Sequence, residues 1–215
     1  KFVKDITPIF REQGIEGQVE DMFIDSSDKV WLIQGNFAYA DNKQVCIPLR
    51  NGRILQDLDI ADNNVLLFYD DSQVDVYEIK TARKVFSSVA LTADKASDYA
   101  GSSVVYKYRT GFFQIRNGNN KAVLLWLDVR QRKWKQILQL DYYLCNMTLR
   151  DEILYVSSAY GYWTYNIRNG ETEHFETIDL EDGRELLTDM NCIEFDRQGG
   201  MWIGTEKRGL LYSPC

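Results

Sequence analysis

Groups able to carry out acid, base or nucleophilic chemistry are scarce in this sequence of 215 residues. His174 is its one histidine, and it alternates with Glu173 and Phe175 in a segment that predicts a strand with one solvated face. A catalytic triad needs such a base beside its serine or cysteine nucleophile, and no motif in the sequence supplies the pair. We therefore expect no catalytic residues, and no enzyme.

The acidic and sulfur-bearing side chains do not form a metal-binding pattern. Turns at Asp25–Asp28 and Asp59–Asp62 hold two carboxylates each, but neither continues into the acidic loop with a distal glutamate that binds calcium. A denser acidic stretch, 179–185, is expected to be a solvated loop. The cysteines lack C-x-x-C spacing and are expected to be free thiols: Cys46, Cys145, Cys192 and Cys215. No metal and no cofactor is predicted.

Exposed aromatic rings offer a second kind of chemistry. A ring face covers the C–H surface of a sugar, while nearby amide, carboxylate or guanidinium groups bind its hydroxyls. Residues of this kind gather in the segments that connect the expected strands, and the ligand-binding candidates are Trp163, Tyr160, Tyr162, Arg208, Asn36, Asp71 and Tyr99. The alternative is packing between structural units or against a neighbouring domain, which is the preferred interpretation for Tyr142 and Tyr143.

The elements that must position these residues form a repeat. Each unit begins with a hairpin whose turn is rich in Asp, Asn, Ser or Gly and whose second strand is almost entirely apolar. Asp25 and Trp31 have the same separation as Asp196 and Trp202. A third strand and a more polar, alternating fourth strand follow. Aromatic residues recur at equivalent strand positions and are expected to pack between units: Trp31, Trp202, Phe113, Tyr39, Tyr77, Tyr165 and Tyr212.

Four strands in each repeat of about 43 residues are typical of a β-propeller. The predicted fold is all-β: a propeller of four-stranded antiparallel blades, about five in number, in a single domain. The blades cover approximately residues 19–49, 56–89, 103–138, 145–178 and 190–215 plus 1–8. In this arrangement Lys1–Ile6 supplies the fourth strand of the last blade and closes the ring. A larger ring, of which these blades are a part, is left open as an alternative.

The last unit, residues 193–214, resembles the two-component regulator propeller repeat. The pattern of that family is Asp-x-x-Gly-x-x-Trp-x-Gly-Thr, followed by Gly-Leu and an aromatic residue. The segment Asp196–Thr205 matches it throughout, whereas the first unit keeps Asp25 and Trp31 but has Asp28 in place of the glycine. The resemblance therefore covers the whole chain as architecture and one blade as a motif.

The resemblance implies a function in signalling. Propellers of this family form the periplasmic sensor regions of hybrid histidine kinases, often in Bacteroidetes that respond to glycans, and occur in other exported proteins. We therefore expect a non-catalytic ligand-sensing or interaction propeller, periplasmic or otherwise exported. Its expected partners are an oligosaccharide ligand and other propeller domains or a homodimer partner. The alternatives are an exported propeller enzyme acting on glycans, as hydrolase or lyase, and a protein-binding scaffold or secretion accessory.

Composition argues against two further classes of partner. The net charge is −7 and no stripe of Lys or Arg is present, which argues against a nucleic-acid backbone. No apolar run approaches the roughly 18 to 20 residues that span a bilayer. We expect no direct insertion into a membrane.

Overall fold

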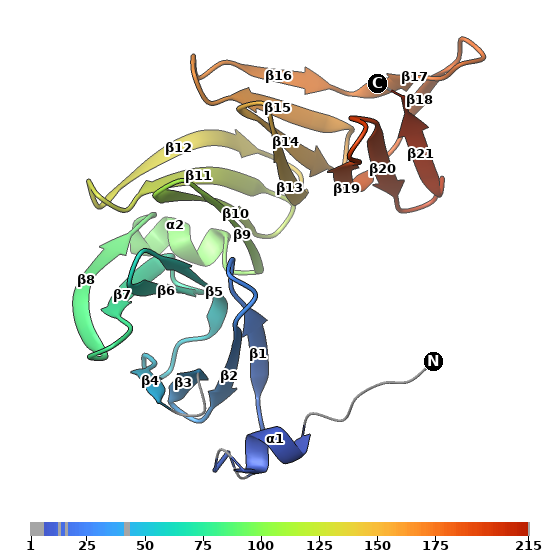
Figure 1. The fold of residues 1–215 in the computed structure, drawn as a ribbon. Coiled ribbons are helices and arrows are strands. Elements are labelled where there is room, and N and C mark those ends of the chain that lie inside the picture. The colour runs from blue at the N-terminus through green and yellow to red at the C-terminus, as the bar shows by residue number, and fades with distance from the viewer. Residues whose placement is uncertain (1–6, 13, 16, 41–43, 215) are drawn as a thin grey trace.

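The computed structural model describes residues 7–12, 14–15, 17–40 and 44–214, whose regular secondary structure is almost entirely β-strand. Figure 1 shows the strands grouped into small twisted sheets that follow one another around an arc. Each sheet is antiparallel, and neighbouring strands in a sheet are consecutive in the sequence. This is the architecture of a β-propeller, and it confirms the predicted fold class.

The first four sheets, blades 1 to 4, each contain four strands. Blade 1 is built from β1 (Asp21–Ile24), β2 (Val30–Gln34), β3 (Phe37–Ala40) and β4 (Val45–Pro48). Blade 2 is built from β5 (Leu55–Ala61), β6 (Asn64–Tyr69), β7 (Gln73–Glu78) and β8 (Arg83–Val89). Blade 3 is built from β9 (Ser102–Tyr108), β10 (Gly111–Asn117), β11 (Ala122–Asp128) and β12 (Lys133–Leu140). Blade 4 is built from β13 (Leu144–Arg150), β14 (Ile153–Ser158), β15 (Tyr162–Asn166) and β16 (Thr172–Phe175).

Blade 5 has three strands within the described residues: β19 (Met190–Phe195), β20 (Met201–Thr205) and β21 (Leu210–Ser213). A separate hairpin of β17 (Thr177–Asp179) and β18 (Glu185–Leu187) precedes it, so the acidic stretch predicted as a loop is partly strand. The fourth strand that the sequence predicts at Lys1–Ile6 lies outside the described residues.

Two short helices accompany the blades. Helix α1 (Thr7–Glu12) precedes blade 1, and α2 (Ala93–Asp98) lies in the connection between blades 2 and 3. Among the described residues, no helix has the length and apolar character that a membrane span requires.

The hairpin turns of blades 1 and 5 share one set of hydrogen bonds. Oδ1 of Asp25 accepts from the backbone N–H groups two and four residues later, at 2.9 and 3.1 Å. Oδ1 of Asp196 does the same at 3.0 and 2.8 Å. The fourth residue of each turn has a left-handed backbone, with φ of 62° at Asp28 and 98° at Gly199. Glycine adopts this conformation at little cost and aspartate tolerates it, which explains the glycine of the sequence pattern.

The hydrophobic core lies between adjacent blades. Trp31 and Ile47 of blade 1 pack with Val65 and Leu67 of blade 2, and all four side chains are buried. Further clusters join blade 2 to blade 3, blade 3 to blade 4 and blade 4 to blade 5. The first strands of the blades are the innermost ones, because β1, β5, β9, β13 and β19 contact one another in this order.

The ring of blades is open in the described part of the chain. Figure 1 shows blade 1 at the lower end of the arc and blade 5 at the upper right, with an opening between them. The prediction that Trp202 and Tyr212 pack between blades is wrong: these side chains are 38% and 50% exposed. Trp31 is 0% exposed because blade 2 covers it, whereas no blade in the described residues covers the outer face of blade 5.

Candidate ligand-binding face

The connections between second and third strands share one face of the propeller with the connections between blades. Side chains tie them together across blade boundaries. Asn117, at the end of β10, exchanges hydrogen bonds with the backbone of Leu144 in blade 4, at 2.8 and 3.1 Å. The Tyr143 hydroxyl accepts from the backbone N–H of Asn120 at 3.4 Å. The face is therefore a continuous surface built by several blades, and the sequence places most of the candidate residues on it.

Four rings meet at the blade 4 end of this face. Trp163 of β15 stacks on His174 of β16, with ring centroids 4.4 Å apart and an interplanar angle of 9°. Nε1 of Trp163 donates to the Tyr142 hydroxyl at 3.0 Å. The Tyr160 ring meets Tyr142 edge to face at 5.0 Å, and its carbonyl oxygen lies 2.7 Å from Nε2 of His174. We call Tyr142, Tyr160, Trp163 and His174 the aromatic cluster.

The aromatic cluster is partly open to solvent. Tyr160 is 49% exposed, and the other three side chains are half-buried. Burial raises the pKa of Tyr142, the hydrogen bond from Trp163 lowers it, and the nearby Glu176 carboxylate raises it further. The Tyr142 hydroxyl therefore stays protonated in neutral solution and can donate a hydrogen bond as well as accept one. An exposed ring beside hydroxyl and imidazole groups is suited to a ligand with both apolar and polar faces.

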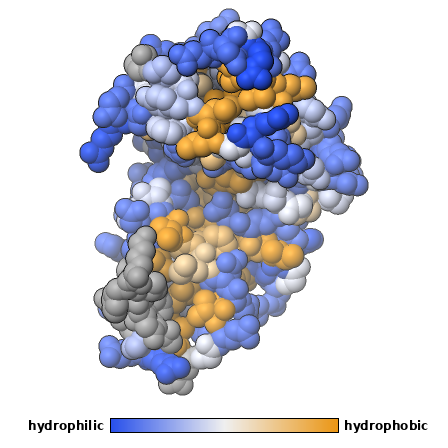
Figure 2. Space-filling view, turned by 90° about the vertical axis from the view of Figure 1, so that its right-hand side faces the viewer, coloured by the Kyte–Doolittle hydropathy of each residue, from blue (hydrophilic) through white to orange (hydrophobic). Residues whose placement is uncertain are grey.

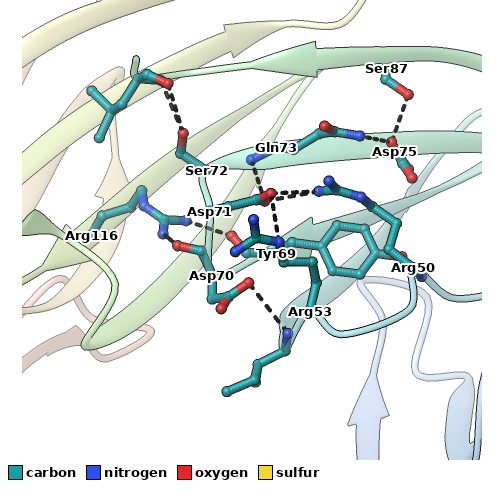
Figure 3. Close-up of polar contacts among 12 residues, drawn as sticks. Arg50, Arg53, Tyr69, Asp70, Asp71, Ser72, Gln73, Asp75, Ser87 and Arg116 are labelled. Atoms are coloured by element: carbon teal, nitrogen blue, oxygen red, sulfur yellow. Dashed lines mark hydrogen bonds and ion pairs between the residues drawn. The ribbon is translucent and has the colours of Figure 1, made fainter. Parts of the chain in front are cut away.

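A second polar cluster lies on blade 2, as Figure 3 shows. Nη1 of Arg50 binds both carboxylate oxygens of Asp71, at 2.9 and 2.8 Å, and Nε of Arg53 lies 3.2 Å from one of them. These contacts fasten the connection between blades 1 and 2 to the β6–β7 turn. Arg53 and Asp71 also line an adjoining cavity of about 410 Å³, whose apolar wall includes Leu91 and Ala96. The charge of Asp71 is thus compensated within the protein.

Arg116 of β10 lies fully buried beneath this turn (Figure 3). It donates to the backbone carbonyls of Tyr69 and Asp70 at 3.0 and 2.5 Å. Burial lowers the pKa of Arg116 to about 10, although the carboxylates of Asp70 and Asp71 act to raise it. The guanidinium remains charged at neutral pH and joins blade 3 to blade 2.

The structure brings together two of the predicted site residues, Tyr160 and Trp163. Tyr162 lies between them in sequence but on the opposite face of β15, because side chains alternate along a strand. It stacks on Phe175 at 4.8 Å, with an interplanar angle of 10°, on the side of blade 4 that faces blade 5.

The other four predicted residues do not join the aromatic cluster. Tyr99 is 5% exposed and packs in a core cluster with Val123 and Leu125. Asp71 is held by the two arginines on blade 2. Asn36 and Arg208 are exposed, in blade 1 and in the β20–β21 connection of blade 5.

Sequence reasoning missed two members of the aromatic cluster. His174 is predicted to be only a solvated strand residue, and Tyr142 is assigned to packing. The available signal was the repeat itself, because antiparallel pairing of the third and fourth strands of blade 4 places Trp163 opposite His174. The position of Tyr142, in the connection before β13, depends on how blades 3 and 4 pack and has no local signal.

Asp57 of β5 is the carboxylic acid whose environment most resembles that of a catalytic group. Burial raises its pKa to about 6, although hydrogen bonds from the backbone N–H groups of Leu58 and Val105 act to lower it. These bonds are 2.8 and 3.0 Å long, and the second joins β5 to β9. Raised carboxyl pKa values often mark catalytic acids. The two backbone contacts instead indicate that Asp57 joins the innermost strands of blades 2 and 3.

Three of the cysteines are half-buried free thiols: Cys46, Cys145 and Cys192. Cys215 lies outside the described residues. Among the residues that the structure describes, no group of three or more His, Cys, Asp or Glu side chains is placed to hold a metal ion.

Comparison with known proteins supports the architecture and the repeat. A family model described as two component regulator propeller matches residues 186–207. A structure described as the extracellular domain of a hybrid two-component system from B. thetaiotaomicron aligns with 90% of this chain at 13% identity and a TM-score of 0.58. BamB from Moraxella catarrhalis aligns with 90% at 10% identity and a TM-score of 0.53. The computationally designed Ika8 protein aligns with 93% at 10% identity and a TM-score of 0.57.

These structural similarities cover only part of each neighbouring protein. This chain spans 27% of the hybrid two-component domain, 63% of BamB and 59% of Ika8, less than two thirds of each. At such low identities they show a shared fold. A comparison with curated proteins found no match.

Proposed function

We propose, from the premise that this chain carries a two-component regulator propeller repeat, that it is a non-catalytic sensing module of a two-component signalling protein. The repeat at residues 186–207 and the propeller fold support a role in signalling. The structural neighbour described as an extracellular domain supports an exported location, periplasmic in a bacterium with two membranes.

The proposed ligand is an oligosaccharide, and the aromatic cluster is the observation that carries this proposal. The exposed Tyr160 ring provides a surface for the C–H face of a sugar. The Tyr142 hydroxyl and the His174 imidazole lie beside it and supply hydrogen-bonding groups for sugar hydroxyls. Because Tyr142 lies in the connection between blades 3 and 4, a bound ligand would contact both that connection and blade 4.

Signalling requires that the ligand bind one arrangement of the protein more tightly than another. The make-up of the aromatic cluster supports such a mechanism, because Tyr142 reaches it from the connection before blade 4 while Trp163 and His174 belong to the outer strands of that blade. A sugar held between them would favour one relative position of the connection and the blade. That difference is what a downstream domain would detect.

The experiment is a screen of oligosaccharides of varied linkage, followed by calorimetric titration of any that binds. In the Tyr160→Ala variant we expect the affinity to fall at least tenfold, or about 1.4 kcal/mol, because the exposed stacking surface is lost. Tyr212→Ala is the matched control, since Tyr212 is equally exposed but lies on blade 5, and its affinity should be unchanged. The absence of any binding oligosaccharide, or equal losses in both variants, would contradict the proposal.

A further inference from the structure

The connection between blades 2 and 3 borders a cavity that the repeat by itself does not build. Residues 90–101 join β8 to β9 and contain helix α2, whereas residues 141–143 are enough to join blade 3 to blade 4. The cavity of about 410 Å³ lies between the longer connection and the loops of blade 2. Its volume is within the range of about 300–1,000 Å³ found for ligand sites in proteins.

The walls of this cavity are fixed by contacts within the protein. The buried Ser72 hydroxyl, in the β6–β7 turn, accepts from the backbone N–H of Leu91 at 3.1 Å and donates to the carbonyl of the same residue at 3.2 Å. Leu91, Ala96 and Tyr99 pack in one core cluster against β11 of blade 3. A ligand that enters the cavity therefore meets walls that are already ordered, which lowers the entropic cost of binding.

Arg53 gives the cavity a cation with unused hydrogen-bond donors. Its Nε lies 3.2 Å from an oxygen of Asp71, but Arg50 already binds both oxygens of that carboxylate (Figure 3). A guanidinium carries five N–H donors, and the described residues provide no further acceptor for this one. The Arg53 side chain is 46% exposed, so a carboxylate that enters the cavity can reach it.

Asp70, in the β6–β7 turn, lines the same cavity with the opposite charge. Its Oδ1 accepts from the backbone N–H of Ile54 at 3.3 Å, which is long for an N–H···O bond. Arg116 binds the backbone carbonyl of Asp70 and not its carboxylate. A carboxylate has about four acceptor sites, so most of those of Asp70 can accept from an ammonium group.

The rest of the cavity wall is largely aliphatic, and it includes Val89, Leu91, Ala93 and Ala96. None of the lining residues that the structure describes is aromatic, which argues against a stacked sugar or nucleobase. A guanidinium, a carboxylate and an aliphatic wall correspond to the three parts of an apolar amino acid: its carboxylate, its ammonium group and its side chain.

We propose that this cavity binds a free α-amino acid with an aliphatic side chain. The carboxylate of the ligand binds Arg53, its ammonium group binds Asp70, and its side chain lies against Leu91 and Ala96. A zwitterion adds no net charge to the site. A simple anion would bring a further negative charge beside Asp70 and Asp71, and a simple cation would bring a positive charge beside Arg53.

Calorimetric titration of the intact chain with L-leucine tests the proposal, because leucine combines both charges with a branched aliphatic side chain. We expect leucine to bind. Isocaproate lacks the amino group of leucine and isoamylamine lacks its carboxylate, so each loses one charge-assisted contact and should bind at least tenfold more weakly. This series uses the unaltered protein, so it decides the proposal even where a variant loses its fold.

A charge variant tests the role of Arg53. Arg53→Gln removes the guanidinium, and Arg50 still holds Asp71, so we expect the fold to be kept and leucine to bind at least tenfold more weakly. Arg184→Gln is the matched control, since Arg184 is an exposed arginine that also binds an aspartate, Asp182, in the β17–β18 turn. Its affinity for leucine should change less than twofold.

A pair of variants on α2 tests the cavity itself. Ala93 lines the cavity and is exposed, so phenylalanine at this position would occupy the space of the ligand. We expect Ala93→Phe to weaken leucine binding at least tenfold. Lys95→Phe places the same ring on α2 at a residue that does not line the cavity, and it should change the affinity less than twofold. Circular dichroism verifies the fold of each variant.

Four outcomes would overturn the proposal. They are failure of leucine to bind, binding of isocaproate or isoamylamine as tight as that of leucine, equal affinity in Arg53→Gln and Arg184→Gln, and equal affinity in Ala93→Phe and Lys95→Phe. Equally tight isocaproate would indicate a site for simple anions instead. None of these outcomes bears on oligosaccharide binding at the aromatic cluster, so the two proposals fail independently.

Discussion

At the scale of single residues, the Asp–Trp pair is a unit that this chain uses twice in different surroundings. Oδ2 of Asp25 accepts from Nε1 of Trp31 at 2.8 Å, and Oδ2 of Asp196 accepts from Nε1 of Trp202 at 3.1 Å. Burial raises the pKa of Asp25, but the hydrogen bonds that its carboxylate accepts outweigh burial and hold the pKa below its usual value. The two pairs have the same chemistry and differ in exposure.

The two copies allow a matched comparison of stability. We expect Asp25→Ala to lower the free energy of unfolding by about 3 kcal/mol, because it leaves the buried indole N–H of Trp31 and turn N–H groups without an acceptor. Asp196→Ala should cost about 1 kcal/mol, since water replaces the lost acceptor at the exposed Trp202. Urea unfolding of both variants is the measurement. Equal costs would show that burial by blade 2 does not determine the contribution of the pair.

The raised pKa of Asp57 predicts that the stability of the fold depends on pH. This pKa is about 6 in the folded protein and close to 3.8 when unfolded, so the folded state binds more protons between these values. The contribution of Asp57 to the free energy of unfolding is therefore complete below about pH 4 and is lost as the pH rises through 6. Relative to Asp57→Asn, the wild type should lose about 2 to 3 kcal/mol between pH 4 and pH 7.5.

The measurement is urea unfolding of both proteins across this pH range. The quantity compared is how the difference between their free energies of unfolding changes with pH. A destabilisation by asparagine that is the same at every pH therefore does not affect the result. A difference that is independent of pH would show that the Asp57 pKa is not raised.

At the scale of elements, the β14–β15 turn controls the geometry of the aromatic cluster. Gly161 has φ of 70°, and a Cβ at this position would lie 1.9 Å from the carbonyl oxygen of Phe175 in β16. Because glycine has no Cβ, β16 can lie this close to the turn and pair with β15. This pairing places His174 against Trp163. The glycine is required both by its backbone conformation and by the neighbouring strand.

We expect Gly161→Ala to lower the free energy of unfolding by about 3 kcal/mol, combining the cost of a left-handed alanine with displacement of β16. Gly170→Ala is the matched control, with φ of 77° and a nearest neighbour at 4.0 Å, and should cost about 1 kcal/mol. Near-ultraviolet circular dichroism should change only for Gly161→Ala, because that substitution separates Trp163 from His174. Identical spectra for the two variants would contradict this role.

At the scale of the whole molecule, the open arc gives the two end blades different surroundings from the central ones. Figure 2 shows hydrophobic side chains in both the upper and the lower half of the side that faces the opening. Exposed apolar residues include Trp202, Leu210 and Tyr212 of blade 5 and Met22 and Ile24 of blade 1. In contrast, all seven residues of β10 in blade 3 are buried.

This gradient in burial predicts a gradient in local stability. Elements with few buried contacts open more readily than the core. Hydrogen exchange measured by mass spectrometry should be slowest for peptides covering β10 and β11 and at least a hundredfold faster for those covering β21. Uniform protection across the five blades would show that the chain opens only as one cooperative unit.

The sequence by itself determined the repeat and, with it, the propeller fold. Alternation along strands, Asp-rich turns and the Asp196–Thr205 pattern are local properties, because turn geometry and strand faces depend on neighbours only a few residues away. The same patterns correctly indicated packing between blades for Trp31 and Phe113, each of which has a following blade.

Only the tertiary structure decided which surfaces remain accessible. Trp202 follows its turn aspartate at the same separation as Trp31, yet its exposure depends on the absence of a covering blade in the described residues. Tyr142 meets Trp163, and helix α2 borders the cavity lined by Arg53, through contacts between separate elements. Burial and proximity of this kind arise from the packing of distant segments, so no local pattern could specify them.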